Sequence, residues 1–275
     1  MTNIALIGAG GKMGYRLSSN LQQSDYTVSH VELSDAGRQR LSEGLGISCV
    51  DAKQAVPDAQ VVILAVPDTL VGRVADELSP LMASGTMVIT LDAAAPFAGH
   101  LPNRDDLVYF VTHPCHPPIF NDETELDAKR DYFGGAKAKQ HIVNALMQGP
   151  EELYALGEAI AKTIYAPVVR SHRVSVDQMA LLEPGLSETV CATLLVVMRE
   201  AMDEVVARGV DQECARDFLL GHMNILAAVI FDEQPGVFSD ACNKAIENGK
   251  PQLMRDDWKR VFEPEEIAES IRRIT

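Results

Sequence analysis

The sequence predicts an α/β fold in which a doubly wound parallel sheet is followed by an all-helical C-terminal domain. Short β-branched runs alternate with amphipathic helical patterns over the first two thirds of the chain, which is typical of βαβ units. A glycine-rich turn directly follows the first apolar run. After about Ser171 the pattern changes to long runs rich in Leu, Val, Ala and Met, which indicate helices.

Near-continuous hydrophobicity marks the expected strands, as it does where helices cover both faces of a sheet. Strands are predicted at residues 4–7, 27–32, 61–66, 87–91 and 107–112, with two more within 140–147 and at 166–170. Helices are predicted at residues 13–23, 36–45, 71–81, 151–164, 174–208, 212–231, 239–248 and 264–274. A kink or helix start is expected at Pro184, because proline removes a helix hydrogen bond. The domains are therefore predicted at residues 1–170 and 171–275.

The charge and composition of the chain argue against nucleic acid and membranes as partners. The chain of 275 residues has a formal net charge of -15 and no basic run, which argues against binding to nucleic acid. Its longest apolar runs, at 192–198 and 225–231, are shorter than the ~20 residues of a membrane span, so no membrane role is expected. Five scattered cysteines favour a reducing, cytoplasmic location over a disulfide framework.

The turn GAGGKMG at residues 8–14 has the spacing G-x-x-G-x-x-G. Glycines there allow the backbone to approach a pyrophosphate, and the following helix presents free N–H groups to it. Glu32 ends the second predicted strand, where a carboxylate binds ribose hydroxyls and repels a 2'-phosphate. This favours NAD over NADP, although Lys12 and Arg38 are long enough to reach such a phosphate. We therefore predict a Rossmann domain with cofactor contacts from Gly8, Gly10, Gly11, Lys12, Met13, Gly14, Glu32, Val66 and Pro67.

Two histidines follow a predicted strand and should lie at the carboxyl edge of the sheet. His113 and His116 belong to the proline-rich segment HPCHPP at residues 113–118. Imidazole titrates near neutral pH, so either histidine is a candidate general acid or base, or a metal ligand. The alternative is a turn with hydrogen-bonded, structural histidines. Cys115 is not needed for oxidation of an alcohol.

Polar residues also interrupt the apolar helical half. Glu183 and Glu188 flank a predicted helix break, and His222 and Asn224 interrupt the next long helix. Polar groups in such stretches need partners, which makes the glutamates candidate catalytic groups and His222 with Asn224 candidate substrate contacts. The alternative is a set of satisfied hydrogen bonds between helices.

Together these segments resemble the 6-phosphogluconate dehydrogenase-like superfamily along essentially the whole chain. Within it, the segments HPCHPP at 113–118, FGG at 133–135, KQHI at 139–142 and ALMQGP at 145–150 resemble the phosphogluconate-dehydrogenase-related branch. The resemblance implies an NAD-dependent oxidation of the secondary alcohol of a small, branched sugar acid, with a coupled rearrangement of the carbon skeleton. It also implies a homodimer held by the helical domain.

One departure from the superfamily bears on catalysis. Its β-hydroxyacid dehydrogenases place a lysine four residues after a helix-opening glycine, whereas counting from Gly185 reaches Thr189 here. The proton must then be transferred by His113, His116, Glu183 or Glu188, and a divalent metal, if required, would be held by His113, His116 and Glu183. Two alternatives stay open: a prephenate-dehydrogenase-like or simple hydroxyacid dehydrogenase, and a non-catalytic dinucleotide-binding redox sensor.

Overall fold

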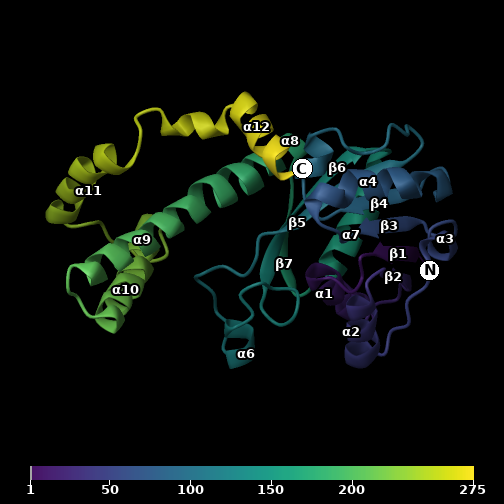
Figure 1. Cartoon of the computed structure of the whole chain (residues 1–275), viewed down its shortest axis with the longest axis horizontal. Coiled ribbons are helices and arrows are strands. Elements are labelled where there is room, and N and C mark those ends of the chain that lie inside the picture. Colours follow the sequence, from purple (N-terminus) through teal and green to yellow (C-terminus); the bar gives the residue numbers. More distant parts are fainter. Residues whose placement is uncertain (1) are drawn as a thin grey trace. The chain divides into compact units, whose positions relative to one another are not determined.

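The computed structural model describes residues 2–275 and is shown in Figure 1. Contacts between residues divide it into two compact units. The first consists of Met1–Leu181 with Ala268–Thr275, and the second of Leu182–Ile267. The first unit thus extends beyond residue 170, because the last strand and the short helix after it pack onto the sheet.

A seven-stranded sheet in the order β2-β1-β3-β4-β5-β6-β7 forms the centre of the first unit. All seven predicted strands are present, with ends shifted by at most three residues. The strands are β1 (Asn3–Ile7), β2 (Thr27–Val31), β3 (Val61–Leu64), β4 (Met87–Thr90), β5 (Val108–Pro114), β6 (Gln140–Gln148) and β7 (Val168–Arg173).

The predicted parallel sheet is confirmed for all neighbouring pairs but one: β6 runs antiparallel to β5, and β7 follows the direction of β6. Parallel neighbours need a crossover that spans the sheet, usually through a helix. The β5–β6 connection contains only the four-residue helix α6 (Leu126–Lys129), so the chain turns back beside β5. The other neighbouring pairs are parallel.

Helices cover both faces of the sheet, and alternate strand residues point to opposite cores. In β1, Ile4 and Leu6 join one apolar core, whereas Ala5 and Ile7 join the other. The helices of this unit are α1 (Lys12–Leu21), α2 (Asp35–Leu45), α3 (Ala52–Ala55), α4 (Asp68–Leu78), α5 (Ala94–Phe97), α6, α7 (Tyr154–Ile164) and α8 (Val176–Ala180), with 3-10 turns η1 (Ser79–Leu81) and η2 (Glu151–Leu153).

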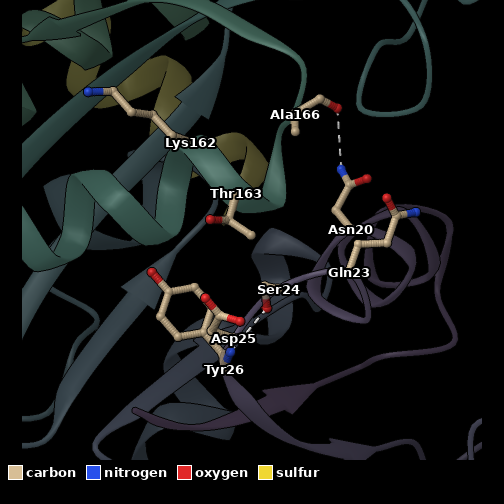
Figure 2. Close-up of a pocket in the computed structure, with 8 residues that line it drawn as sticks. All are labelled: Asn20, Gln23, Ser24, Asp25, Tyr26, Lys162, Thr163 and Ala166. Atoms are coloured by element: carbon tan, nitrogen blue, oxygen red, sulfur yellow. Dashed lines mark hydrogen bonds between the residues drawn. The ribbon is translucent and has the colours of Figure 1, made fainter. Parts of the chain in front are cut away.

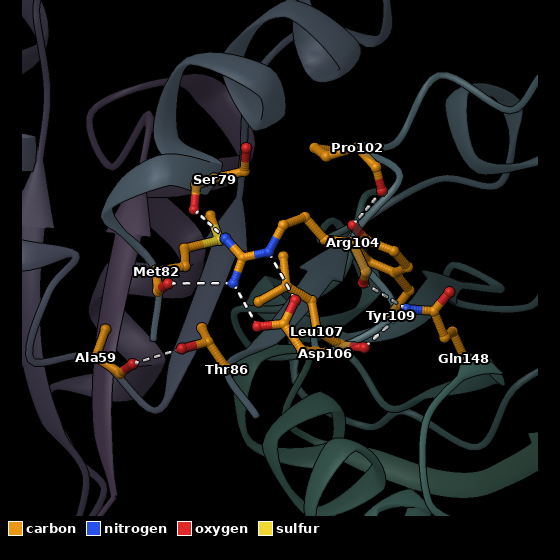
Figure 3. Close-up of polar contacts among 10 residues, drawn as sticks. All are labelled: Ala59, Ser79, Met82, Thr86, Pro102, Arg104, Asp106, Leu107, Tyr109 and Gln148. Carbon is orange, nitrogen blue, oxygen red and sulfur yellow. Dashed lines mark hydrogen bonds and ion pairs between the residues drawn. The ribbon is translucent and has the colours of Figure 1, made fainter. Parts of the chain in front are cut away.

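Arg104 connects the segments that precede β4 and β5 through its polar contacts (Figure 3). Its guanidinium pairs with Asp106 at 2.6 Å and donates to the carbonyl oxygen of Ser79 at 2.7 Å. The side-chain amide of Gln148 donates to the carbonyl oxygens of Arg104 and Leu107. These bonds hold the loop before β5 at the edge opposite the glycine turn, so this part of the fold serves as scaffold.

The remaining helices are η3 (Leu181–Ala192, a π-helix), α9 (Thr193–Ala207), α10 (Gln212–Ile230), α11 (Asp240–Leu253), η4 (Trp258–Phe262, a 3-10 helix) and α12 (Pro264–Ile274). Of the two alternatives expected at Pro184, a kink or a helix start, the helix start was wrong. The helix continues through Pro184 with π-helical turns, in which a wider hydrogen-bond spacing accommodates a residue that lacks an N–H.

The helical stretch Val176–Ala207 is long and apolar enough, by length and composition alone, to cross a membrane. Each apolar run of the sequence is too short for a membrane span when it is taken singly. The π-helix, however, continues directly into α9 and makes one long helix of them. Apolar side chains exposed on a helix also suit an interface between protein chains. Glu183 and Glu188 lie within the stretch. Because charged side chains are costly inside a membrane, they favour an interface between protein chains over a membrane span.

Candidate active site

The glycine turn is packed so closely against neighbouring backbone that Gly8 and Gly14 have no room for a Cβ atom. Gly8 has a positive φ of 78°, and a Cβ built on it would lie 2.4 Å from the carbonyl oxygen of Ala65. A Cβ on Gly14 would lie 2.0 Å from the carbonyl oxygen of Gly8. The N–H of Gly8 donates to the carbonyl oxygen of Val31 at 2.9 Å. The turn is therefore fixed between the carboxyl ends of β2 and β3, with its backbone bare of side chains.

Glu32 lies beside the turn and is 8% exposed. Its carboxylate accepts hydrogen bonds from the N–H of Gly10 at 2.9 Å and from the N–H of Ser34 at 2.8 Å. Burial on its own raises the pKa of Glu32, but hydrogen bonds from Ser34, Gly10 and Leu33 outweigh it, so the pKa lies below its usual value. The carboxylate is thus ionised at neutral pH and held at the place where a ribose would bind.

Replacing Glu32 by Ser should raise the affinity for NADP relative to NAD by roughly tenfold, because a carboxylate that repels a 2'-phosphate is removed. Titration of both cofactors against the variant measures the ratio. Glu43→Ser, an exposed position on α2, is the matched control. A ratio unchanged from that of the parent protein would remove Glu32 from the cofactor site.

The segment that follows β3 also borders the turn. A Cβ on Gly8 would lie 3.1 Å from Cγ1 of Val66, and Pro67 precedes the first turn of α4. Met13 packs against the core that lies beneath α1. These positions agree with the cofactor contacts predicted for Val66, Pro67 and Met13, which stay predictions.

A covering loop, residues 115–139, reaches from β5 to the start of α1. The ring of Phe133 lies 4.6 Å from the ammonium of Lys12 and 4.5 Å from the guanidinium of Arg16. Arg16 also donates to the carbonyl oxygen of Gly134 at 3.1 Å. The FGG segment at 133–135 is thus fastened to the phosphate-binding helix, and Lys12 is directed to an aromatic ring of this loop.

His113 lies at the end of β5, next to a carboxylate that the sequence reading missed. Its Nδ1 lies 2.9 Å from the carbonyl oxygen of Leu91 and 3.5 Å from Oδ2 of Asp92. Asp92 is itself held by the N–H of Ala94 at 2.6 Å. Because a carbonyl and a carboxylate can only accept, such contacts place the ring proton on Nδ1 and leave the lone pair on Nε2. The signal that could have found Asp92 is its position two residues after the end of β4, at the carboxyl edge of the sheet.

His116 is brought close to His113 by a left-handed backbone with φ of 59°. The two rings are edge to face, with centroids 6.1 Å apart. Nδ1 of His116 lies 2.8 Å from the carbonyl oxygen of Phe133, so His116 connects the histidine pair to the covering loop. Cys115 is exposed, and its N–H donates to the carbonyl oxygen of His141.

A buried polar chain fixes the strands behind His113. The hydroxyl of Thr112 donates to Asn144 at 2.6 Å, Asn144 donates to Ser171 at 2.8 Å, and Ser171 donates to Glu158 at 2.6 Å. Hydrogen bonds from Ser171 and Lys162 lower the pKa of Glu158. Because this chain links β5, β6 and β7, it sets their register next to the histidines. Nothing in the sequence marked these residues as a group.

The helical candidates lie in the second unit. Glu183 and Glu188 belong to the π-helix η3, and Thr189, which stands where the superfamily has lysine, donates to the carbonyl oxygen of Pro184 at 2.6 Å. His222 and Asn224 lie on α10. Nδ1 of His222 lies 2.8 Å from the carbonyl oxygen of Phe218 in the same helix. The roles predicted for the two glutamates, His222 and Asn224 stay predictions.

A hollow of about 640 Å³ lies on the first unit, away from the glycine turn and the histidine pair (Figure 2). It is formed by the ends of α1 and α7 and the start of β2. Its lining is polar and contains none of the cofactor or catalytic candidates: Asn20, Gln23, Ser24, Asp25, Tyr26, Lys162, Thr163 and Ala166. The chemistry is therefore expected at the carboxyl edge of the sheet, where the glycine turn and the histidine pair lie.

Two family models match the chain. Residues 3–97 match the NAD binding domain of 6-phosphogluconate dehydrogenase, and residues 121–275 match the C-terminal domain of phosphogluconate dehydrogenase (decarboxylating). The N-terminal part is therefore an NAD-binding domain, as the glycine turn predicted, and the resemblance to the 6-phosphogluconate dehydrogenase-like superfamily is confirmed.

Similar proteins cover the whole chain. The D-apionate oxidoisomerase of Cupriavidus necator is 71% identical over 99% of both chains, and that of Rhizobium rhizogenes is 71% identical over the full length of both. A crystal structure of a semialdehyde dehydrogenase NAD-binding protein from Cupriavidus necator, in complex with calcium and NAD, is 70% identical and covers 100% of both chains with a TM-score of 0.99. The fold and the cofactor class are thus shared with oxidoreductases.

Proposed function

Since this chain belongs to the phosphogluconate-dehydrogenase-related family that contains the D-apionate oxidoisomerases, we propose that it oxidises D-apionate with NAD and rearranges the carbon skeleton of the product. The observation that carries the proposal is the 71% identity along the full length. The site is consistent with it, because a bare glycine turn and an Asp92–His113 pair lie at the same edge of the sheet.

Different residues of the chain bind the cofactor and transfer the proton in the proposed oxidation. The backbone of the glycine turn binds the pyrophosphate, and Glu32 positions the adenosine ribose. NAD bound there accepts the hydride from the secondary alcohol carbon. Nε2 of His113 takes the hydroxyl proton, so that the alcohol becomes a ketone, and Asp92 stabilises the imidazolium that results.

We further propose that a divalent metal is bound for the rearrangement. The described residues supply a suitable oxygen donor at the histidine pair, since the carboxylate of Asp92 lies next to the ring of His113, and carboxylate oxygens bind divalent cations. His113, His116 and Glu183 are the ligands proposed from the sequence, and Asp92 is a further candidate. A metal held there polarises a ketone oxygen.

The test is a substrate panel followed through NADH absorbance, with D-apionate, prephenate and simple β-hydroxyacids, each with and without a chelator. D-apionate alone should be turned over, and the chelator should suppress the rearranged product until a divalent cation is restored. Turnover of prephenate instead would support the dehydrogenase alternative. NADH binding without any turnover would support the redox sensor.

We propose a homodimer formed through the helical domain. Many large apolar side chains of the second unit are exposed in the single chain, among them Leu195, Val196, Phe218, Ile230 and Phe231. Surfaces of this kind are usually covered by another protein. Light scattering on dilute protein should therefore give about twice the chain mass of 29.9 kDa. A stable, active monomer would contradict a shared helical core.

The proposed location is the cytoplasm, with a small sugar acid as partner and neither nucleic acid nor a membrane. The five cysteines are free thiols, as expected for a reducing compartment. The acidic net charge of -15 disfavours polyphosphate partners.

A further inference from the structure

Gly37 lies on α2 at a point where this helix meets the glycine turn. A Cβ built on Gly10 would lie 2.6 Å from the backbone of Gly37, so the two glycines let the turn and the helix pack backbone to backbone. Gly37 is buried, whereas its chain neighbours Ala36 and Arg38 are exposed. Glycine is a poor helix former, and its presence at a buried contact within a helix indicates that space is required there.

The space beside Gly37 is filled by the side chain of Glu32. A Cβ added to Gly37 would lie 2.6 Å from Cδ and 2.7 Å from Cγ of Glu32, and 2.7 Å from Oγ of Ser34. Real Cβ atoms essentially never come closer than 3.0 Å to another heavy atom. A side chain at position 37 must therefore displace Glu32, Ser34 or both.

Both crowded side chains belong to the hydrogen bonds that hold one carboxylate. The N–H and the hydroxyl of Ser34 donate to Oε1 of Glu32 at 2.8 Å and 2.9 Å, and Oγ of Ser34 accepts from the N–H of Gly37 at 3.1 Å. Oε2 of Glu32 accepts from the N–H of Gly10 at 2.9 Å. Displacement of either side chain therefore disturbs the position of the Glu32 carboxylate beside the turn.

We propose that Gly37 determines the preference for NAD, because the absence of a side chain there lets the carboxylate of Glu32 lie where the adenosine ribose binds. This role rests on the part of the proposed function in which Glu32 positions that ribose. A displaced carboxylate loses its hydrogen bonds to the ribose hydroxyls and no longer repels a 2'-phosphate. Gly37 is thus a positioning residue, which acts on the cofactor through Glu32.

The test compares Gly37→Ala with Gly44→Ala by calorimetric titration with NADH and NADPH. Gly44 lies on the same helix, and a Cβ there would also be too close to a side chain, 2.3 Å from Oη of Tyr15. Gly37→Ala should raise the ratio of the Kd for NADH to the Kd for NADPH roughly tenfold, the range of one lost hydrogen bond to a charged group. Gly44→Ala should leave this ratio unchanged, because its contact does not involve Glu32.

Glu32→Ala, which lacks Cγ and Cδ, tests whether Gly37 acts through Glu32. In this background, Gly37→Ala should change the ratio no further. An equal change of the ratio in both backgrounds overturns the proposal, and so does equal weakening of both dinucleotides by Gly37→Ala, since Gly37 then serves only the packing of helix and turn. Where Gly37→Ala alone does not fold, a folded double variant supports the contact with Glu32, and an unfolded one overturns it.

Glu32→Ala by itself separates this proposal from the proposed function. A ratio that changes in Glu32→Ala but not in Gly37→Ala overturns only the role of Gly37. A ratio that changes in neither variant overturns the ribose-binding role of Glu32 as well. Oxidation of D-apionate is measured on the wild-type protein and enters neither comparison, so its absence would overturn the proposed substrate and leave the role of Gly37 in place.

Discussion

Replacing His113 by Asn is expected to lower kcat on D-apionate by roughly 100-fold or more, while the affinity for NAD stays nearly unchanged. Asn keeps a polar side chain beside Leu91 and Asp92 but cannot take a proton near neutral pH. The glycine turn does not depend on this side chain, so cofactor binding should survive. Steady-state kinetics and NADH titration of the same preparation measure the two quantities.

Three further variants define the role of His113. His116→Asn should have the smaller effect, because among the described residues a carboxylate lies beside the ring of His113 and none pairs with His116. Asp92→Asn should reduce kcat, since the carboxylate that lies beside Nδ1 of His113 is lost. His100→Asn, an exposed position, is the control. Near-wild-type turnover of His113→Asn would exclude His113 as the base, and joint loss of binding and turnover would indicate a structural histidine.

Gly8→Ala is expected to weaken NAD binding by roughly 100-fold or more, because the new Cβ would lie 2.4 Å from the carbonyl oxygen of Ala65. No real Cβ contact is that short, so the turn must move away from β3. The N–H groups that face the pyrophosphate would move with it. NADH fluorescence titration measures the affinity, and thermal unfolding measures the accompanying loss of stability, about 1 to 3 kcal/mol.

Gly85→Ala is the matched control for backbone strain. Gly85 has a positive φ of 84°, close to the 78° of Gly8, but a Cβ there meets nothing within 4 Å. Its substitution should cost only the left-handed backbone penalty of about 1 kcal/mol and leave NAD binding intact. Gly11→Ala, whose Cβ would lie 3.3 Å from the carbonyl oxygen of Gly8, should be intermediate. Equal affinities for NAD in all three variants would show that the turn does not contact the cofactor.

The sequence by itself determined the α/β class, the seven strands and the NAD-binding turn. These features rest on local patterns: strand hydrophobicity, glycines at residues 8–14, and an acidic residue at the end of the second strand. Each depends on a short stretch of chain whose preferences agree with the final fold. The position of His113 at the carboxyl edge also followed from its place directly after a strand.

Only the tertiary structure decided which side chains meet. Asp92 precedes His113 by 21 positions in the chain, and Arg170 follows His141 by 29. Their contacts depend on strand order, on the antiparallel return of β6 and on its irregular register with β7. A shift of one residue moves a side chain to the other face of a sheet. Hydrophobic periodicity marks strands but leaves their partners unspecified, because pairing is fixed by long-range packing and by buried hydrogen bonds such as those of Asn144.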